Sequence, residues 1–119
     1  MPHDLDIAVK AHIDWLGRLM QALQRNHASA ELRAETAGGC LFGQWLSEQA
    51  AEPGHAPADL QRIDICHQAM HRLATGLLQM SQGDESYYAS LDRFCQTAIE
   101  FNRLVTALAP PTVQARHSA

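Results

Sequence analysis

Two histidines four positions apart, His67 and His71, have the spacing in this sequence that is best suited to shared chemistry. Residues at i and i+4 project from one face of a helix, so two imidazole rings there can reach a common metal ion at about 2.0–2.1 Å. Without a metal, two unpaired histidines in a core would each cost desolvation free energy. The pair therefore favours a metal site, and the alternative is a half-exposed polar pair on the flank of a helix.

His12 and Cys40 extend this pair to a set of four possible ligands. His12 lies on the apolar stripe of the first helical segment, where a lone histidine is more often a core polar group satisfied by one hydrogen bond. Cys40 follows a glycine pair and opens the stretch CLFGQWL, and a helix N-terminus favours the thiolate over the thiol. Three imidazole nitrogens and one thiolate suit tetrahedral zinc better than magnesium, calcium or a di-iron centre. We therefore interpret His12, Cys40, His67 and His71 as candidate zinc ligands.

Amphipathic helices are the elements that must position these four side chains. Within residues 4–26 the apolar positions alternate steps of four and three, which predicts a helix with one buried face. That stripe consists of Leu5, Val9, His12, Leu16, Leu19 and Leu23. Residues 28–39 are weakly helical at best, and the spacing of the apolar residues in 41–46 predicts a short two-turn helix after Cys40.

Two further long helices follow a loop rich in proline and glycine. Pro57 suits the first turn of a helix that runs to about Gln82, and its stripe consists of Leu60, Ile63, His67, Met70, Ala74 and Leu77. The last helix ends before Pro110 and presents Tyr87, Leu91, Phe94, Ala98, Phe101, Val105 and Leu108. Of these, Tyr87, Phe94 and Phe101 are expected not to be fully covered within one chain, which favours a homodimer. We predict an all-α fold, an antiparallel four-helix-type bundle with one short extra helix. Residues 1–110 form its single domain, and residues 111–119 are expected to be a disordered tail.

The charge and hydropathy of the chain argue against nucleic acids and membranes as partners. The chain has 119 residues, of which 46% are hydrophobic and 18% charged, and its formal net charge of -4 is spread without basic runs. We therefore expect no nucleic-acid partner and no attraction to an anionic membrane. No stretch reaches the roughly 18 apolar residues of a membrane span, and the first residues are acidic where a signal peptide is basic. We expect a cytoplasmic protein, in which three cysteines without a CxxC pair stay reduced.

Three short motifs together resemble a known family. The stretches HIDW from His12, CLFGQWL from Cys40 and HQAMH from His67 are similar to the chemoreceptor zinc-binding (CZB) domain family, over residues from about 5 to 108. That family has a His shortly before a Trp, then Cys-x-Phe/Leu-Gly-x-Trp, then His-xxx-His. The resemblance implies one Zn²⁺ bound by His12, Cys40, His67 and His71 in a helical bundle that commonly forms homodimers. It further implies a regulatory module of bacterial cytoplasmic chemoreceptors or diguanylate cyclases.

The interpretation that we prefer is a sensory module in which zinc loading or oxidation of Cys40 changes the packing of the bundle. The family's usual receptor or cyclase region does not accompany the motifs, so the output is expected in trans or elsewhere in a longer chain. The alternatives are a structural dimerisation bundle with a structural zinc and, less favoured, a metal-dependent hydrolase. We expect no enzyme activity, because HQAMH lacks the Glu of HExxH and four protein ligands close the coordination shell.

The remaining cysteines, histidines and tryptophans have simpler interpretations. Cys66 and Cys95 lie beside core stripes, where a buried free thiol acts as a small hydrophobe. Trp15 and Trp45 are interpreted as aromatics that wall the site and exclude water. Residues in termini or loops are interpreted as solvated, and these are His3, His27, His55 and His117.

Overall fold

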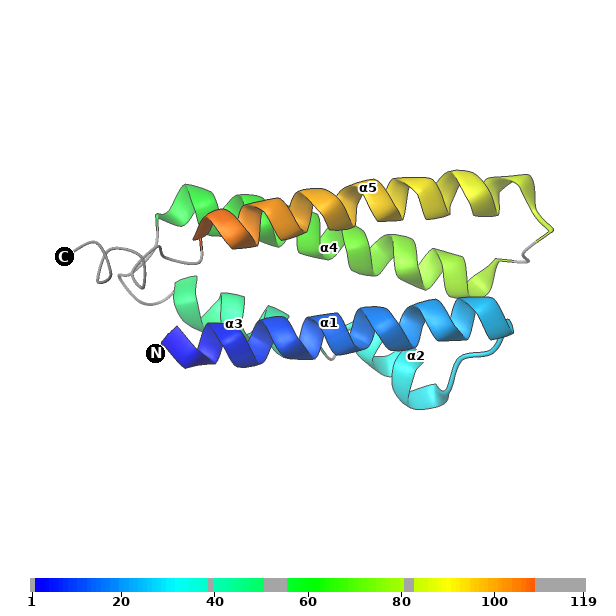
Figure 1. The fold of residues 1–119 in the computed structure, drawn as a ribbon, viewed down its shortest axis with the longest axis horizontal. Coiled ribbons are helices and arrows are strands. Elements are labelled where there is room, and N and C mark those ends of the chain that lie inside the picture. Colours follow the sequence, from blue (N-terminus) through cyan, green and yellow to red (C-terminus); the bar gives the residue numbers. More distant parts are fainter. Residues whose placement is uncertain (1, 39, 51–55, 81–82, 109–119) are drawn as a thin grey trace.

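A computed structural model describes residues 2–38, 40–50, 56–80 and 83–108. Its five helices are α1 (Pro2–Arg25), α2 (Ala30–Ala37), α3 (Leu41–Ala50), α4 (Pro57–Gln79) and α5 (Glu85–Leu108), with no strand in these residues. In Figure 1, α2 and α3 return end to end beside α1, and α4 and α5 continue the antiparallel path. The predicted all-α bundle of four-helix type is therefore confirmed, since α2 and α3 share one of the four positions.

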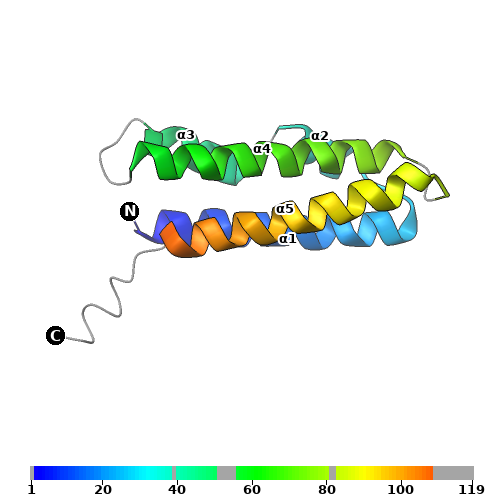
Figure 2. The same cartoon turned by 90° about the horizontal axis from the view of Figure 1, so that it is seen from above.

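The bundle has two layers, which Figure 2 shows from above. The first layer holds α1 and α5, and the second holds α4 with α2 and α3. Among the described residues, no Cα atom of α1 lies within 8 Å of a Cα atom of α5. The two helices instead meet through rings: the centroids of His12 and Phe101 lie 4.6 Å apart, and those of Trp15 and Phe94 lie 6.4 Å apart.

Helix α1 buries a stripe slightly rotated from the predicted one. His12 and Leu19 are buried as predicted, but Trp15 and Ala8 complete the core, while Val9 and Leu16 are only half-buried. The rotation has a simple cause, since the large indole gains more apolar burial than an aliphatic side chain. It brings Trp15 beside the candidate ligands.

The end of α1 is a Schellman turn built on Asn26, whose φ of 55° lies in the left-handed region. The N–H of His27 donates to the carbonyl of Ala22 at 3.0 Å, and the N–H of Asn26 donates to that of Leu23 at 3.3 Å. Asparagine tolerates this backbone conformation better than most side chains. Asn26 and His27 therefore form an ordered reversal of the chain at the end of α1.

Helix α2 corrects the prediction that residues 28–39 are weakly helical at best. Ser29 caps it, since its Oγ accepts a hydrogen bond from the backbone N–H of Leu32 at 3.1 Å. Eight residues are too few for a helix to be stable alone, so tertiary burial of Leu32 and Thr36 must supply the remaining free energy. The hydrophobic pattern of the sequence did not predict this helix, because only these two of its side chains are buried.

Helices α4 and α5 follow the predicted patterns closely. Pro57 stands in the first turn of α4, and all six predicted stripe residues of α4 are buried. Helix α5 buries Tyr87, Phe94, Phe101 and Val105. The predicted stop at Pro110 and the predicted tail, residues 111–119, lie outside the described residues. None of the helices described combines the length and the apolar character needed to span a bilayer.

Candidate metal centre

The four residues predicted as ligands meet in the middle of the bundle. His12 comes from α1, Cys40 immediately precedes α3, and His67 and His71 come from adjacent turns of α4. Each offers one ligand atom, and the four atoms all lie within 4.8 Å of one another. The Sγ atom of Cys40 lies 3.4 Å from Nε2 of His67. Tetrahedral zinc with ordinary bond lengths has ligand atoms about 3.3–3.6 Å apart, so this pair already has the required separation.

Two of the imidazole nitrogens are buried without any hydrogen-bond partner in the described structure. They are Nε2 of His12 and Nε2 of His71. Leaving such a polar atom buried and unsatisfied costs about 1–3 kcal/mol. A metal ion bound between these nitrogens, the Cys40 sulfur and Nε2 of His67 would satisfy both. The donor set therefore fits zinc chemically as well as geometrically.

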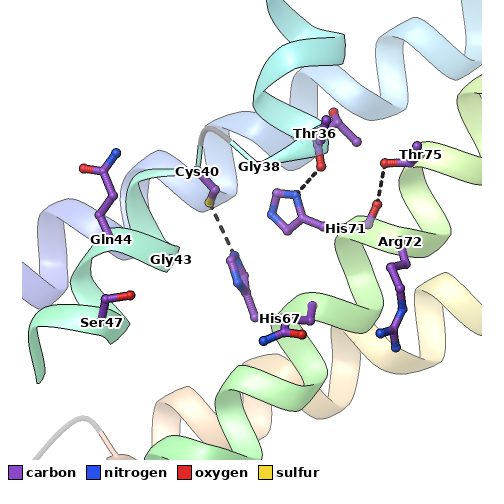
Figure 3. A pocket seen from close by; sticks show the side chains of 12 residues that line it. Thr36, Gly38, Cys40, Gly43, Gln44, Ser47, His67, His71, Arg72 and Thr75 are labelled. Atoms are coloured by element: carbon purple, nitrogen blue, oxygen red, sulfur yellow. Dashed lines mark hydrogen bonds between the residues drawn. The ribbon is translucent and has the colours of Figure 1, made fainter. Parts of the chain in front are cut away.

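The other ring nitrogen of His71 has a defined partner. Its Nδ1 lies 2.8 Å from the backbone carbonyl of Thr36, the bond drawn in Figure 3. A second hydrogen bond of this kind holds a metal-binding histidine in one orientation and raises its basicity. Sequence reasoning missed Thr36. Carbonyl groups in the last turn of a helix lack intrahelical partners and often bind a side chain from elsewhere. This rule could have pointed to Thr36 only if the sequence had predicted helix α2, which it did not.

His67 is positioned by the close approach of α3. A Cβ atom at Gly43 would stand 3.4 Å from Cε1 of His67, so hydrogen at this position lets α3 lie directly against the ring. A branched side chain would push the ring away from Cys40. The glycine of the CLFGQWL stretch therefore serves the site by its small size.

Burial keeps the imidazoles in the neutral form that binds metals. It lowers the pKa of His12 from 6.5 to about 3, with repulsion from protonated His67 and His71 as smaller causes. Burial also lowers the pKa of His67 to about 4, with His71 as the second cause. The pKa of His71 is lowered by burial too, against the opposing hydrogen bond to Thr36. Near pH 7 a metal ion therefore displaces no proton from His12 or His67.

The pKa of the Cys40 thiol is shifted in the opposite direction from the one that the sequence suggested. The backbone N–H groups of Gly43 and Phe42 do favour its thiolate, as a helix N-terminus should. Burial is the larger cause, however, and it raises the pKa of the Cys40 thiol in the metal-free protein. The thiolate is therefore expected only when a metal ion compensates the buried charge.

An aromatic wall surrounds the site on the side of α1 and α5. Trp15 stacks on His71 with ring centroids 4.2 Å apart and planes inclined by 12°. His12 contacts Phe42 and Phe101 at centroid distances of 5.7 and 4.6 Å. Trp15 thus contacts a candidate ligand directly, as a wall of the site should, and Trp45 packs against Phe42, which contacts His12. The contact between Phe101 and His12 was not predicted from the sequence.

The opposite side of the site opens into a cavity of about 600 Å³. Three candidate ligands line it, namely Cys40, His67 and His71, as Figure 3 shows. Gln44 and Ser47 line it from α3. Small molecules can therefore reach the sulfur from the gap between α3 and α4, while His12 closes the site from the core.

The other cysteines and histidines stay outside this cluster. Cys66 is half-buried, and Cys95 is exposed, which corrects its interpretation as a buried hydrophobe. The correction arises because Cys95 lies one position past the buried Phe94, on the outer side of α5. His27 is exposed beyond the end of α1. The side chains of His3, His55 and His117 lie outside the described residues.

Comparison with known proteins gives one match. A family model described as "Chemoreceptor zinc-binding domain" matches residues 12–78, which is more than half of the chain. The matched region begins at His12 and includes all four residues of the cluster. No curated protein and no solved structure matches the chain.

Proposed function

Because the chain belongs to the chemoreceptor zinc-binding domain family, we propose that it is a regulatory module of bacterial signalling. Zinc is its cofactor, and the ligands that we propose are His12, Cys40, His67 and His71. One observation carries this assignment: two buried, unpartnered imidazole nitrogens converge with a thiol and a third imidazole within 4.8 Å. Four protein ligands leave no open position for a substrate, which favours regulation over hydrolysis.

The regulatory step that we propose is local release of α3. When bound, zinc holds the Cys40 sulfur as a thiolate and cross-links the start of α3 to α1 and α4. Loss of the sulfur as a ligand removes the cross-link at the start of α3, whereas α4 and α5 keep their buried stripes. A bistable element of this kind can control a chemoreceptor or a diguanylate cyclase, in trans or in the same chain. A reducing compartment such as the cytoplasm suits the thiolate.

Zinc removal tests this function directly. We expect elemental analysis to find about one zinc per chain, as the single cluster of four ligands implies. Chelation should then raise amide hydrogen exchange in α3 while the exchange of α5 stays nearly constant, because α3 loses the cross-link at its start and α5 carries no ligand. Absence of zinc from the purified protein would refute the proposal. Unfolding of all helices together on chelation would instead support the structural-zinc alternative.

We also propose a homodimer, on different residues from those that the sequence suggested. The sequence-based expectation was that Tyr87, Phe94 and Phe101 would lack cover within one chain, and it was wrong because all three are buried. Met20 of α1 lines one pocket together with Tyr88 and Leu91 of α5, and further apolar residues at helical spacing extend this surface as one stripe on each helix. On α1 they are Val9, Ile13, Leu16 and Met20, and on α5 they are Tyr88, Leu91 and Ile99, all half-buried or exposed. A second copy covering this face would bury both stripes.

Sedimentation of matched variants tests the dimer. The wild-type protein is expected to sediment at twice the 13.1 kDa chain mass at micromolar concentration. Ile13→Glu should shift it to the monomer, because a charge would be buried in the interface. Ile65→Glu is the control, since Ile65 is equally exposed, at 60%, but lies on the outer face of α4. A wild-type monomer, or equal effects of both variants, would contradict this assignment.

A further inference from the structure

The buried residue Thr36 of α2 links three helices beside the candidate metal site, because it is hydrogen-bonded to both α1 and α4. The indole N–H of Trp15 on α1 donates to Oγ1 of Thr36 at 2.9 Å, and that hydroxyl donates to the carbonyl of Leu32 at 2.7 Å. The backbone carbonyl of the same threonine meets Nδ1 of His71 on α4 at 2.8 Å. Thr36 is only 1% exposed, so these bonds do not compete with water.

The contact with Thr36 fixes which nitrogen of His71 carries the proton. In neutral histidine either ring nitrogen can carry it, and the other nitrogen is then the acceptor. A carbonyl oxygen accepts hydrogen bonds and donates none, so Nδ1 must hold the proton here. Nε2, which is buried without a partner, is then left with the free electron pair that a metal requires.

The side chain of Thr36 holds this carbonyl in place. The carbonyl belongs to the last turn of an eight-residue helix, an end that would fray without tertiary contacts. The bond from Trp15 anchors that turn to α1 and at the same time fixes the indole. The indole in turn stacks on His71 at 4.2 Å. The ring of His71 is therefore held at its edge by the carbonyl and on its face by Trp15, and both contacts depend on Thr36.

We propose that Thr36 is a positioning residue of the zinc site, which holds His71 in the Nδ1–H tautomer and aims Nε2 at the metal. This inference rests on the proposed function for its effect on zinc, but the tautomer itself is a property of the metal-free protein. It makes α2 part of the site: the residue that orients His71 lies four positions before the ligand Cys40.

The test compares Thr36→Val with Thr36→Ser and with a matched control, Thr75→Val. Thr75 also lines the cavity, and its hydroxyl donates to the backbone carbonyl of His71 at 2.9 Å, four residues earlier on α4. Both valine variants thus remove a threonine hydroxyl beside His71, but only Thr36→Val disturbs the ring. Circular dichroism establishes that each variant is folded before its zinc affinity is measured by competition with a chelator.

We expect Thr36→Val to weaken zinc binding by roughly 10–100-fold, the usual effect of losing a group that orients a metal ligand. Thr36→Ser, which keeps the hydroxyl, should restore affinity, and Thr75→Val should stay close to wild type. Long-range ¹⁵N–¹H spectra of the metal-free protein should show His71 with its proton on Nδ1 in the wild type. In Thr36→Val they should show a mixture of the two tautomers.

Two results would overturn the proposal. One is a wild-type His71 with its proton on Nε2, whether or not the protein binds zinc. The other is a Thr36→Val variant that matches Thr75→Val in both tautomer and affinity. A wild-type protein that shows the expected tautomer but binds no zinc would refute the proposed function instead, so the two failures can be told apart.

Discussion

His67→Ala or His71→Ala is expected to weaken zinc binding by roughly 10²–10³-fold. Structural zinc sites with four protein ligands bind with about 10–16 kcal/mol, so one ligand accounts on average for about 2.5–4 kcal/mol. Within the described structure no other histidine, cysteine or carboxylate joins the cluster, so none of these residues can replace the lost nitrogen. The measurement is competition against a chelator of known affinity, followed by elemental analysis of the dialysed variant.

The matched control for these variants is His27→Ala. His27 is exposed, and it does not belong to the cluster of candidate ligands. Its replacement should leave zinc affinity unchanged. Equal losses in His27→Ala and His67→Ala would mean that zinc binds somewhere other than the proposed site. The metal-free variants should remain folded, because their buried apolar stripes are intact.

A second large effect is expected in the order in which the cysteines are oxidised. In the zinc-loaded protein, a slight excess of hypochlorous acid should oxidise Cys40 first, although Cys40 is only 5% exposed and Cys95 is exposed. A zinc-bound sulfur is a thiolate, which is the reactive form, and the cavity between α3 and α4 gives the oxidant access to it. Oxidation to the sulfenic acid makes the sulfur a far poorer ligand, so zinc should be released.

In the metal-free protein Cys40 should lose this advantage. Burial raises the pKa of the Cys40 thiol there, so Cys40 should be oxidised more slowly than in the zinc-loaded protein. Mass spectrometry of peptides after brief treatment gives the order in both states. Oxidation of Cys66 or Cys95 before Cys40 in the zinc-loaded protein would contradict the proposal that oxidation of Cys40 releases α3. So would a Cys40→Ser variant that responds to oxidant as the wild type does.

Local patterns in the sequence were enough to identify the pair of candidate ligands, His67 and His71, and to predict most of the fold. The spacing of His67 and His71 places both rings on one face of a helix whatever surrounds it, because helical geometry depends only on neighbouring residues. For the same reason the stripe of α4 and its start at Pro57 were predicted correctly. The meeting of His12 and Cys40 with this pair followed from the chemistry that three imidazoles and a thiol share, and from the resemblance of the motifs.

Only the tertiary structure decided how the site is supported and how it behaves. The carbonyl of Thr36 meets His71 across 35 positions of sequence, and this contact depends on an eight-residue helix that is stable only when packed. The sign of the pKa shift of Cys40 also depends on packing, since desolvation by distant segments outweighs the local effect of the helix N-terminus. Likewise, burial of Phe94 and exposure of Cys95 depend on the side of α5 that faces α1. Periodicity identifies a face of a helix, but the neighbours that cover it come from elsewhere in the chain, and they determine burial, charge and hydrogen-bond partners.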